Sequence, residues 1–301
     1  MVATAATNTI SSTPTTIGVY ALNLPVNPTA NLTFDDGGLP SDGSGNVFGT
    51  ATVLGSGGAG NTGYIELTAA ENGLTGSFVL EDLNNGEPVT SMTAEFYIRM
   101  TGGTSPPADG MSFSWSPTVL RDGFREEGTG EDLIVAFDTY DNGGGEAPAI
   151  ELRWRGESLG NVRVPIDLLM DPDFVQVLVR VNPGGTCDVV FGNQVIFWQK
   201  PLPNWEPLAG ARYGWGGATG GLNQSNSLDS IKITTSVSGQ QPDAAIAISV
   251  SGSDLVITFD GTLQTSTTTS GWTNVNGAVS PLRVPLSTLN GTPRRFWRSV
   301  R

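Results

Sequence analysis

Short apolar runs recur along the whole chain, and glycine, asparagine or proline bounds most of them. Clear examples lie at residues 91–100, 110–115, 133–137 and 175–181. No segment of about a dozen residues has apolar side chains at the period of an α-helix. Apolar or alternating runs of this length between turn residues are typical of β-strands. The chain of 301 residues, with 40 glycines and 19 prolines, is therefore expected to be all-β.

The strongest local prediction is a hairpin over residues 187–198, CDVVFGNQVIFW. Two apolar strands, 188–191 and 194–198, flank a Gly-Asn dipeptide. A two-residue turn of this composition favours antiparallel pairing of the strands on either side. Cys187 is the single cysteine, so an intramolecular disulfide is excluded, and we interpret this residue as a small buried apolar side chain.

The distribution of strands and polar segments predicts one large domain and one small one. Residues 18–237 form a continuous series of predicted strands, and the polar connector SGQQPD follows at residues 238–243. Residues 244–301 contain further apolar runs, which predict a small β-sandwich-like module with Trp272 as an anchor of its core. Residues 1–17 are rich in threonine and serine, so we expect a short flexible leader there.

The charge of the chain restricts the ligands that it can bind. The formal net charge is -14, and there is no stripe of basic residues to displace the counterions of a nucleic acid. Neutral or weakly charged ligands fit better. No apolar run reaches the roughly 18 residues that a membrane-spanning helix needs. The opening residues lack the basic and apolar regions of a signal peptide, so we expect a secreted or cell-surface protein from which such a peptide has been removed.

A loop rich in oxygen ligands directly follows the apolar run at 133–137. Asp138, the Tyr140 carbonyl, Asn142 and Glu146 lie within nine residues, and three glycines separate the last two. Calcium accepts about six to eight oxygens, whereas zinc and copper favour imidazole or thiolate. The chain has no histidine and one cysteine, so calcium is the expected ion. The alternative is an acidic hairpin loop solvated by water, with no bound ion.

Three stretches of the predicted large domain resemble the legume (L-type) lectins and their bacterial relatives, whose fold is the concanavalin A-like jelly-roll β-sandwich. The first stretch is PPADGMSFSW, residues 106–115, in which an Ala-Asp-Gly turn precedes an apolar strand. In the family the aspartate of this turn binds sugar hydroxyls, which implies that role for Asp109, with Gly110 beside it in the site. The resemblance also implies a cis peptide bond between Ala108 and Asp109.

The second stretch is IVAFDTYDN, residues 134–142, which resembles the lectin strand that delivers the metal ligands. The resemblance implies that Asp138, Tyr140 and Asn142 bind calcium and that Asn142 also binds the sugar. Tyr140 is in addition a candidate for the aromatic face that stacks on the sugar. Glu146 lies near the position at which the family places a further acidic ligand, so it completes the implied calcium site.

This second stretch departs from the family at the transition-metal site. That site requires a glutamate and a histidine, where the chain has Ala136 and, near the second position, Ala149. The resemblance therefore implies a single calcium site and no manganese site. Glu126 or Glu127, just upstream, is a further candidate ligand or else a solvated loop charge.

The third stretch is RYGWGGATGGLNQSNSLDSIKI, residues 212–233, which resembles the late lectin strand and the loop that contacts the monosaccharide. The resemblance implies that Gly221, Leu222 and Asn223 form this loop. The three stretches also occur along the chain in the same order as in the lectins.

These implied features favour a non-catalytic, calcium-dependent protein that binds a polysaccharide or a cell-surface glycan. One alternative is a structural or adhesive surface protein whose sugar site has decayed, because the manganese ligands and a late histidine are missing. The other is a jelly-roll polysaccharide-degrading enzyme. Hydrolases of this shape place paired carboxylates at alternate positions of a strand, and in the nearest equivalent here, Glu151-Leu-Arg153, a cation takes the second position.

Overall fold

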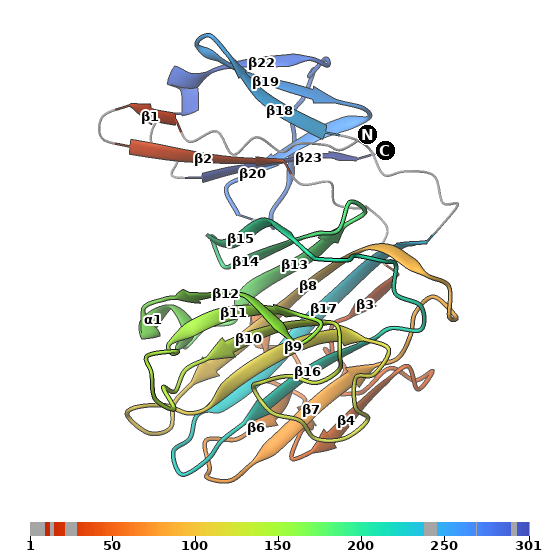
Figure 1. The fold of residues 1–301 in the computed structure, drawn as a ribbon, viewed down its shortest axis with the longest axis vertical. Helices are drawn as coiled ribbons and strands as arrows, with labels where there is room; N and C mark the ends of the chain where they lie inside the picture. Colours follow the sequence, from red (N-terminus) through yellow and green to blue (C-terminus); the bar gives the residue numbers. More distant parts are fainter. Residues whose placement is uncertain are drawn as a thin grey trace. The chain divides into compact units, whose positions relative to one another are not determined.

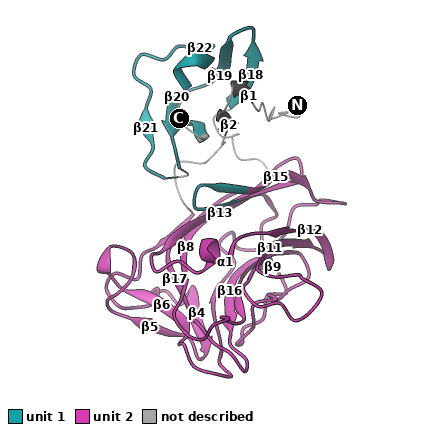
Figure 2. Cartoon of the chain, turned by 90° about the vertical axis from the view of Figure 1, so that its left-hand side faces the viewer, with its two compact units in different colours: residues 1–28, 190–195, 239–301 teal, residues 29–189, 196–238 magenta. Residues whose placement is uncertain are grey.

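The computed structural model describes residues 10–12, 15–21, 29–237, 246–268, 270–289 and 294–300. The chain divides into two compact units (Figure 2). The larger unit comprises residues 29–189 and 196–238, and the smaller comprises residues 1–28, 190–195 and 239–301. Nearly every element is a strand. Among the described residues, the helical segments are α1 (Ile166–Leu169) and two 3-10 turns, η1 (Ala59–Asn61) and η2 (Leu286–Leu289).

Two antiparallel sheets build the larger unit, called the larger domain from here on (Figure 1). The seven-stranded sheet has the order β12 (Glu157–Arg163), β11 (Ala149–Trp154), β10 (Leu133–Asp138), β9 (Gly110–Ser116), β16 (Arg212–Ala218), β7 (Thr75–Leu80) and β4 (Gly45–Gly49). The eight-stranded sheet has the order β15 (Gln194–Pro201), β14 (Thr186–Phe191), β13 (Val175–Asn182), β8 (Val89–Thr101), β17 (Ser225–Val237), β6 (Tyr64–Thr68) and β5 (Thr52–Leu54), and β3 (Ala30–Leu32) pairs with β17.

Large aromatic side chains fill the space between the two sheets. Phe96 of β8 lies 5.3 Å from Phe113 of β9 and 5.5 Å from Trp215 of β16, measured between ring centroids. All three side chains are fully buried. Because each sheet buries one face of alternating apolar residues against the other, the predicted jelly-roll β-sandwich is confirmed.

The strands expected from short apolar runs form close to their predicted limits. The runs at 91–100, 110–115, 133–137 and 175–181 lie within β8, β9, β10 and β13. The predicted hairpin at 187–198 is also present, since β14 and β15 are neighbours that flank its Gly-Asn turn. Cys187 is buried and free, as its interpretation as a small apolar residue requires.

The smaller unit contains a five-stranded and a three-stranded sheet. The first has the order β1 (Ile10–Ser12), β2 (Thr15–Ala21), β23 (Arg294–Val300), β20 (Thr262–Ser266) and β21 (Thr273–Asn274), and the second has the order β18 (Ile246–Ser251), β19 (Asp254–Phe259) and β22 (Leu282–Pro285). Its core includes Ile257, Leu263 and Trp297. Trp272, the predicted anchor, is only half-buried, and the guanidinium of Arg298 lies 4.5 Å from its ring centroid. Trp297 takes the anchoring position because it lies on β23, the central strand of the five-stranded sheet.

The structure differs from the sequence prediction at the N-terminal end of the chain. The predicted leader, residues 1–17, contains β1, and β2 crosses the predicted boundary at residue 18. β2 pairs in parallel with β23, so both ends of the chain contribute strands to the smaller unit. The Thr-rich composition that indicated a leader is equally suited to a β-strand, because threonine is β-branched. The predicted connector at 238–243 lies outside the described residues.

Candidate cation and glycan site

The pairing of β9 with its two neighbouring strands brings the loop after β10 and the loop after β16 to Asp109. Gly110, the first residue of β9, pairs with Asp138 of β10 on one side and with Ala218 of β16 on the other. The Asp109 backbone N–H donates to the Ala218 carbonyl at 3.0 Å, and the Thr139 N–H donates to the Asp109 carbonyl at 3.0 Å. Asp109, the loop after β10 and the loop after β16 therefore meet at one end of the seven-stranded sheet.

Gly110 is required by this close packing. Its φ is 138°, and a Cβ at this position would lie 2.2 Å from the Phe137 carbonyl oxygen. A side chain would therefore separate β9 from β10 at the point where Asp109 is placed. The peptide bond between Ala108 and Asp109 is cis, as expected.

The Asp109 carboxylate is largely buried and has one cationic neighbour. Asp109 is 9% exposed, and Arg125 Nη2 lies 3.3 Å from its Oδ2. Burial raises the pKa of Asp109, Arg125 opposes this rise, and Glu127 adds to it. Gly220 approaches closely, since a Cβ on it would lie 3.2 Å from Asp109 Oδ2.

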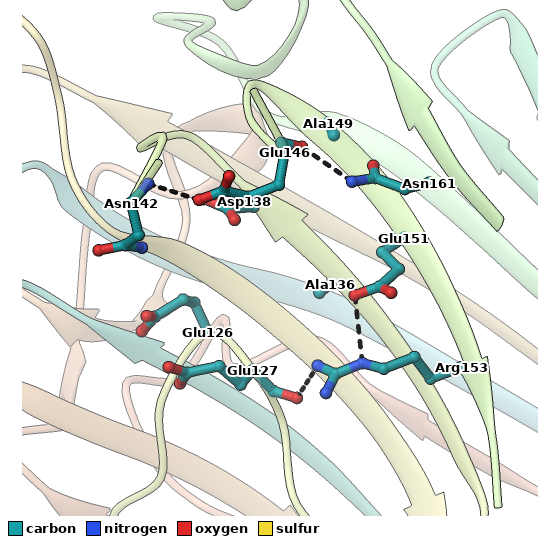
Figure 3. A pocket seen from close by; sticks show the side chains of 10 residues that line it. All are labelled: Glu126, Glu127, Ala136, Asp138, Asn142, Glu146, Ala149, Glu151, Arg153 and Asn161. Atoms are coloured by element: carbon teal, nitrogen blue, oxygen red, sulfur yellow. Dashed lines mark hydrogen bonds and ion pairs between the residues drawn. The ribbon is translucent and has the colours of Figure 1, made fainter. Parts of the chain in front are cut away.

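The loop between β10 and β11 folds around its own carboxylates (Figure 3). Asp138 Oδ1 accepts from the Tyr140 N–H at 3.0 Å, and Glu146 Oε1 accepts from the Asn142 N–H at 2.5 Å. Asp141, which had no predicted role, accepts from two backbone N–H groups of the glycine run that follows. Asp138, Asn142 and Glu146 also line one pocket, so the structure brings together the three predicted side-chain ligands.

A buried chain of hydrogen bonds fastens this loop to the opposite sheet. The Thr139 hydroxyl donates to Gln224 Oε1 at 2.8 Å, and Gln224 Nε2 donates to Asn226 Oδ1 at 2.8 Å. Asn226 Nδ2 in turn donates to the hydroxyl of Thr68 on β6 at 2.8 Å. The sequence prediction missed this network, although buried polar residues beside apolar strands are a signal that such partners exist.

The predicted glycan loop is braced by residues far away in the sequence. The Asn72 side chain donates to the Gly221 carbonyl at 3.0 Å and accepts from Asn223 Nδ2 at 2.5 Å. The Gly220 N–H donates to the Leu222 carbonyl at 3.0 Å, which closes the turn. Gly221, Leu222 and Asn223 therefore form the predicted loop, while Gly220 makes the close approach to Asp109.

A cavity of about 140 Å³ lies beneath the loop between β10 and β11. Ten residues line it: Glu126, Glu127, Ala136, Asp138, Asn142, Glu146, Ala149, Glu151, Arg153 and Asn161 (Figure 3). Five of these carry carboxylates and one carries a guanidinium. The two alanines are those that the resemblance compares with the family's transition-metal ligands, Ala149 only near the second position. Within the described ranges, no three Asp, Glu or Cys side chains are already grouped closely enough to hold a metal ion.

Two carboxylates in this cavity have strongly raised pKa values. Burial raises the pKa of Glu126 to about 7, and the nearby charges of Glu127 and Asp109 add to the rise against Arg125. Burial also raises the pKa of Asp138 to about 6, with Glu146, Asp109 and Glu127 adding and the Tyr140 N–H opposing. The cavity thus concentrates negative charge that the protein compensates only in part.

The far side of the cavity holds an ion pair. Arg153 Nε lies 3.3 Å from Glu151 Oε2, and Arg153 also donates to the Glu127 carbonyl (Figure 3). Glu151 is therefore next to a cation on the same face of β11, where a glycosidase pair requires a second carboxylate.

No family model matches the sequence, and no curated protein is similar to it. Solved structures do resemble it. The Emp47p carbohydrate recognition domain has a TM-score of 0.54 at 17% identity and matches 69% of this chain and 96% of its own. Lectin I-B4 from Griffonia simplicifolia, in a metal-free form, has a TM-score of 0.51 at 15% identity and matches 69% of this chain and all of its own, 100%.

The larger domain has the L-type lectin fold. A third structure, the Ca2+-bound form of the VIP36 exoplasmic/lumenal domain, agrees at a TM-score of 0.50 and 16% identity and matches 71% of this chain and 93% of its own. At identities this low, the structural similarity establishes the fold alone. The ligand has to be argued from the residues of this chain. Among the described residues, no helix has the length and apolar character needed to cross a membrane.

Proposed function

We propose that the larger domain is a non-catalytic, calcium-dependent carbohydrate-binding domain. The observation that supports this most directly is the register of Gly110, which brings Asp109 against both the loop after β10 and the loop after β16. Three segments that are distant in sequence supply a recessed carboxylate, an amide side chain and a glycine-rich loop at one end of a sheet. Packing alone gives no reason for a largely buried aspartate in that position, because burying a carboxylate is costly.

The donor set fits calcium. Asp138 and Glu146 offer carboxylates, Asn142 offers an amide oxygen and Tyr140 a backbone carbonyl, and calcium prefers such oxygen ligands. When bound, the ion would supply positive charge to a carboxylate-rich cavity and rigidity to a loop that contains Gly143, Gly144 and Gly145. We propose a single calcium site, because Ala136 and Ala149 provide no ligand for a transition metal.

Asp109 and Asn142 are the proposed polar contacts to the glycan. The Asp109 carboxylate would accept from sugar hydroxyls, and the Asn142 amide, oriented by the ion, would donate to them. Gly110 holds the aspartate in place, while Gly221, Leu222 and Asn223 offer backbone N–H groups and a side chain from the braced loop. Tyr140 is half-buried beside this site and is the proposed aromatic face for stacking on C–H groups.

The proposed target is a polysaccharide or a cell-surface glycan, and the proposed location is the cell exterior or the cell surface. A neutral glycan suits a chain with a net charge of -14. The ion pair between Glu151 and Arg153 argues against a glycosidase, because it occupies the strand positions at which two carboxylates would be needed.

Glycan-array binding in calcium and in EDTA tests this function. We expect the protein to bind a defined set of glycans only in calcium, and Asp109→Ala to abolish that binding without unfolding the domain. Asp173→Ala is the matched control, because Asp173 is an exposed aspartate in the segment between α1 and β13. Equal glycan binding by the wild type and Asp109→Ala would contradict the proposed site.

A further inference from the structure

Glu126 has a buried carboxylate with one oxygen atom that has no hydrogen-bond partner among the described residues. The residue is 6% exposed, and its Oε2 atom has no hydrogen-bond partner among the described residues. Its other oxygen, Oε1, lies 3.6 Å from Arg125 Nη2, which is longer than a hydrogen bond. An ionised group in this position is costly unless something outside the protein pairs with it.

The backbone on both sides of Glu126 is fixed, so the direction of its side chain is set by the fold. The buried Ser112 hydroxyl of β9 donates to the Arg125 carbonyl at 2.9 Å, and the Gly128 N–H donates to the same carbonyl at 3.0 Å. Arg153 donates to the Glu127 carbonyl. One hydrogen bond thus closes the turn at residues 125–128 and two hold it against the sheet, and Glu126 lines the cavity.

The charges around the cavity indicate that the group able to pair with Glu126 is a cation. Five carboxylates line it against the single guanidinium of Arg153, and that guanidinium already pairs with Glu151. A volume of about 140 Å³ accommodates a cation and a few waters. Glu126 and Asp138 line the same cavity from different segments, the loop between β9 and β10 and the end of β10 (Figure 3).

We propose that Glu126 is a further ligand of the calcium ion, supplied by the loop between β9 and β10. This inference rests on the proposed function, because it adds a carboxylate to the same ion. It gives the orphaned Oε2 atom a partner and gives the ion a ligand from a second loop. By fixing Glu126, the ion would also fix the neighbouring residue Arg125. Arg125 Nη2 lies 3.3 Å from Asp109 Oδ2.

Calcium titration by calorimetry, at pH 8 and without glycan, tests the proposal. We expect Glu126→Gln to raise the Kd for calcium at least about tenfold, because a charged ligand is lost while the side-chain shape is kept. Glu131→Gln is the matched control, since Glu131 is exposed on the same loop, and its Kd should equal that of the wild type. A Kd for Glu126→Gln within about twofold of the wild-type value would overturn the proposal.

Thermal unfolding supplies a second readout that a merely structural role would not produce. In EDTA, Glu126→Gln should unfold at or above the wild-type temperature, because it removes a buried charge whose Oε2 atom has no hydrogen-bond partner. In saturating calcium the order should reverse, because the wild type gains more from the ion. A variant that is less stable than the wild type by the same amount in both buffers would assign Glu126 to packing and overturn the inference.

The outcomes separate this inference from the proposed function. If the wild type binds no calcium, both fail together. If Asp138→Asn loses calcium binding while Glu126→Gln keeps the wild-type Kd, only the role of Glu126 fails. In saturating calcium, Glu126→Gln should recover wild-type glycan affinity, and a lasting defect would place Glu126 in contact with the glycan instead of the ion.

Discussion

At the scale of single residues, Gly110 decides where the Asp109 carboxylate lies. The absence of a Cβ lets β9 approach the Phe137 carbonyl, and the pairing of Gly110 with both Asp138 and Ala218 then places Asp109 between two loops. The proposed glycan-binding carboxylate and the residue that positions it are therefore neighbours in the sequence. Asp109 supplies the side chain, and Gly110 allows the close approach because it has none.

Gly110→Ala should lower the free energy of unfolding by more than about 2 kcal/mol, because a clash with backbone adds to the cost of a positive φ. Urea unfolding measures this change. Gly43→Ala is the matched control, since Gly43 has a φ of 73° but nothing lies within 4 Å of an added Cβ. Its expected cost is about 1 kcal/mol. Equal costs for the two variants would show that the close approach at Gly110 does not matter.

At the scale of elements, the loop between β10 and β11 combines a glycine-rich middle with an anchored start. Its glycines permit the positive φ values of 122°, 92° and 78° at residues 143–145, while Thr139 is anchored through Gln224 to the opposite sheet. Asp138 lies at the junction of these two parts. The proposed calcium ligands therefore lie on a glycine-rich loop whose start is hydrogen-bonded to the opposite sheet.

Asp138→Asn should abolish the rise in Tm that calcium produces in the wild type. Calcium at a hundred times its Kd would stabilise the folded wild-type protein by about 2.7 kcal/mol, provided that it does not bind the unfolded chain. Thermal unfolding in EDTA and in calcium measures the effect, with Asp173→Asn as the exposed control. The calcium site would be wrong if Asp138→Asn kept the full calcium-dependent rise.

β2 is the element that links the first residues of the chain to the last. It pairs with β23 over Gly18 to Ala21, and its removal would leave β23 with an unpaired edge next to water. Deleting residues 1–21 should therefore destabilise the smaller unit while the calcium-dependent rise in Tm of the larger domain is retained. Scanning calorimetry measures both transitions. An unchanged transition of the smaller unit would contradict the structural role of β2.

At the scale of the whole molecule, excess negative charge collects in one cavity of an acidic protein. Glu126 and Asp138 have raised pKa values in the folded, metal-free protein, so the folded state holds their protons more tightly than the unfolded state does. The stability that protonation contributes is present at low pH and is lost as the pH rises through about 6 and 7. A bound cation competes with these protons, so the stability that the cation contributes increases as the pH rises.

Stability in EDTA should accordingly rise as the pH falls from 8 to about 6, and the calcium-dependent gain in Tm should shrink over the same interval. Thermal unfolding at several pH values with and without calcium measures both trends. The double variant Glu126→Gln, Asp138→Asn should lose the rise in EDTA. A wild-type protein whose stability in EDTA falls steadily from pH 8 to pH 6 would contradict the charge arrangement described for the cavity.

Much of the larger domain and of its candidate site could be predicted from the sequence. The limits of β9 and β10 follow from local patterns, because alternation of apolar residues and the turn preferences of glycine and asparagine act between near neighbours. The cis bond before Asp109 and the proposed calcium ligands came from motif resemblance. The place of β2 in the smaller unit was missed, because its partner β23 lies at the other end of the chain.

The sequence by itself determined that this chain is an all-β protein and which residues after the Leu133–Asp138 strand can offer oxygen ligands. Only the tertiary structure decided that Asn72 braces the loop after β16, that Gln224 anchors Thr139 and that the Oε2 atom of Glu126 is buried without a hydrogen-bond partner. The physical reason is the range of the interactions. Strand formation depends on side chains a few residues apart, whereas these contacts depend on which surfaces the packed sheets bring together, and no local pattern encodes that.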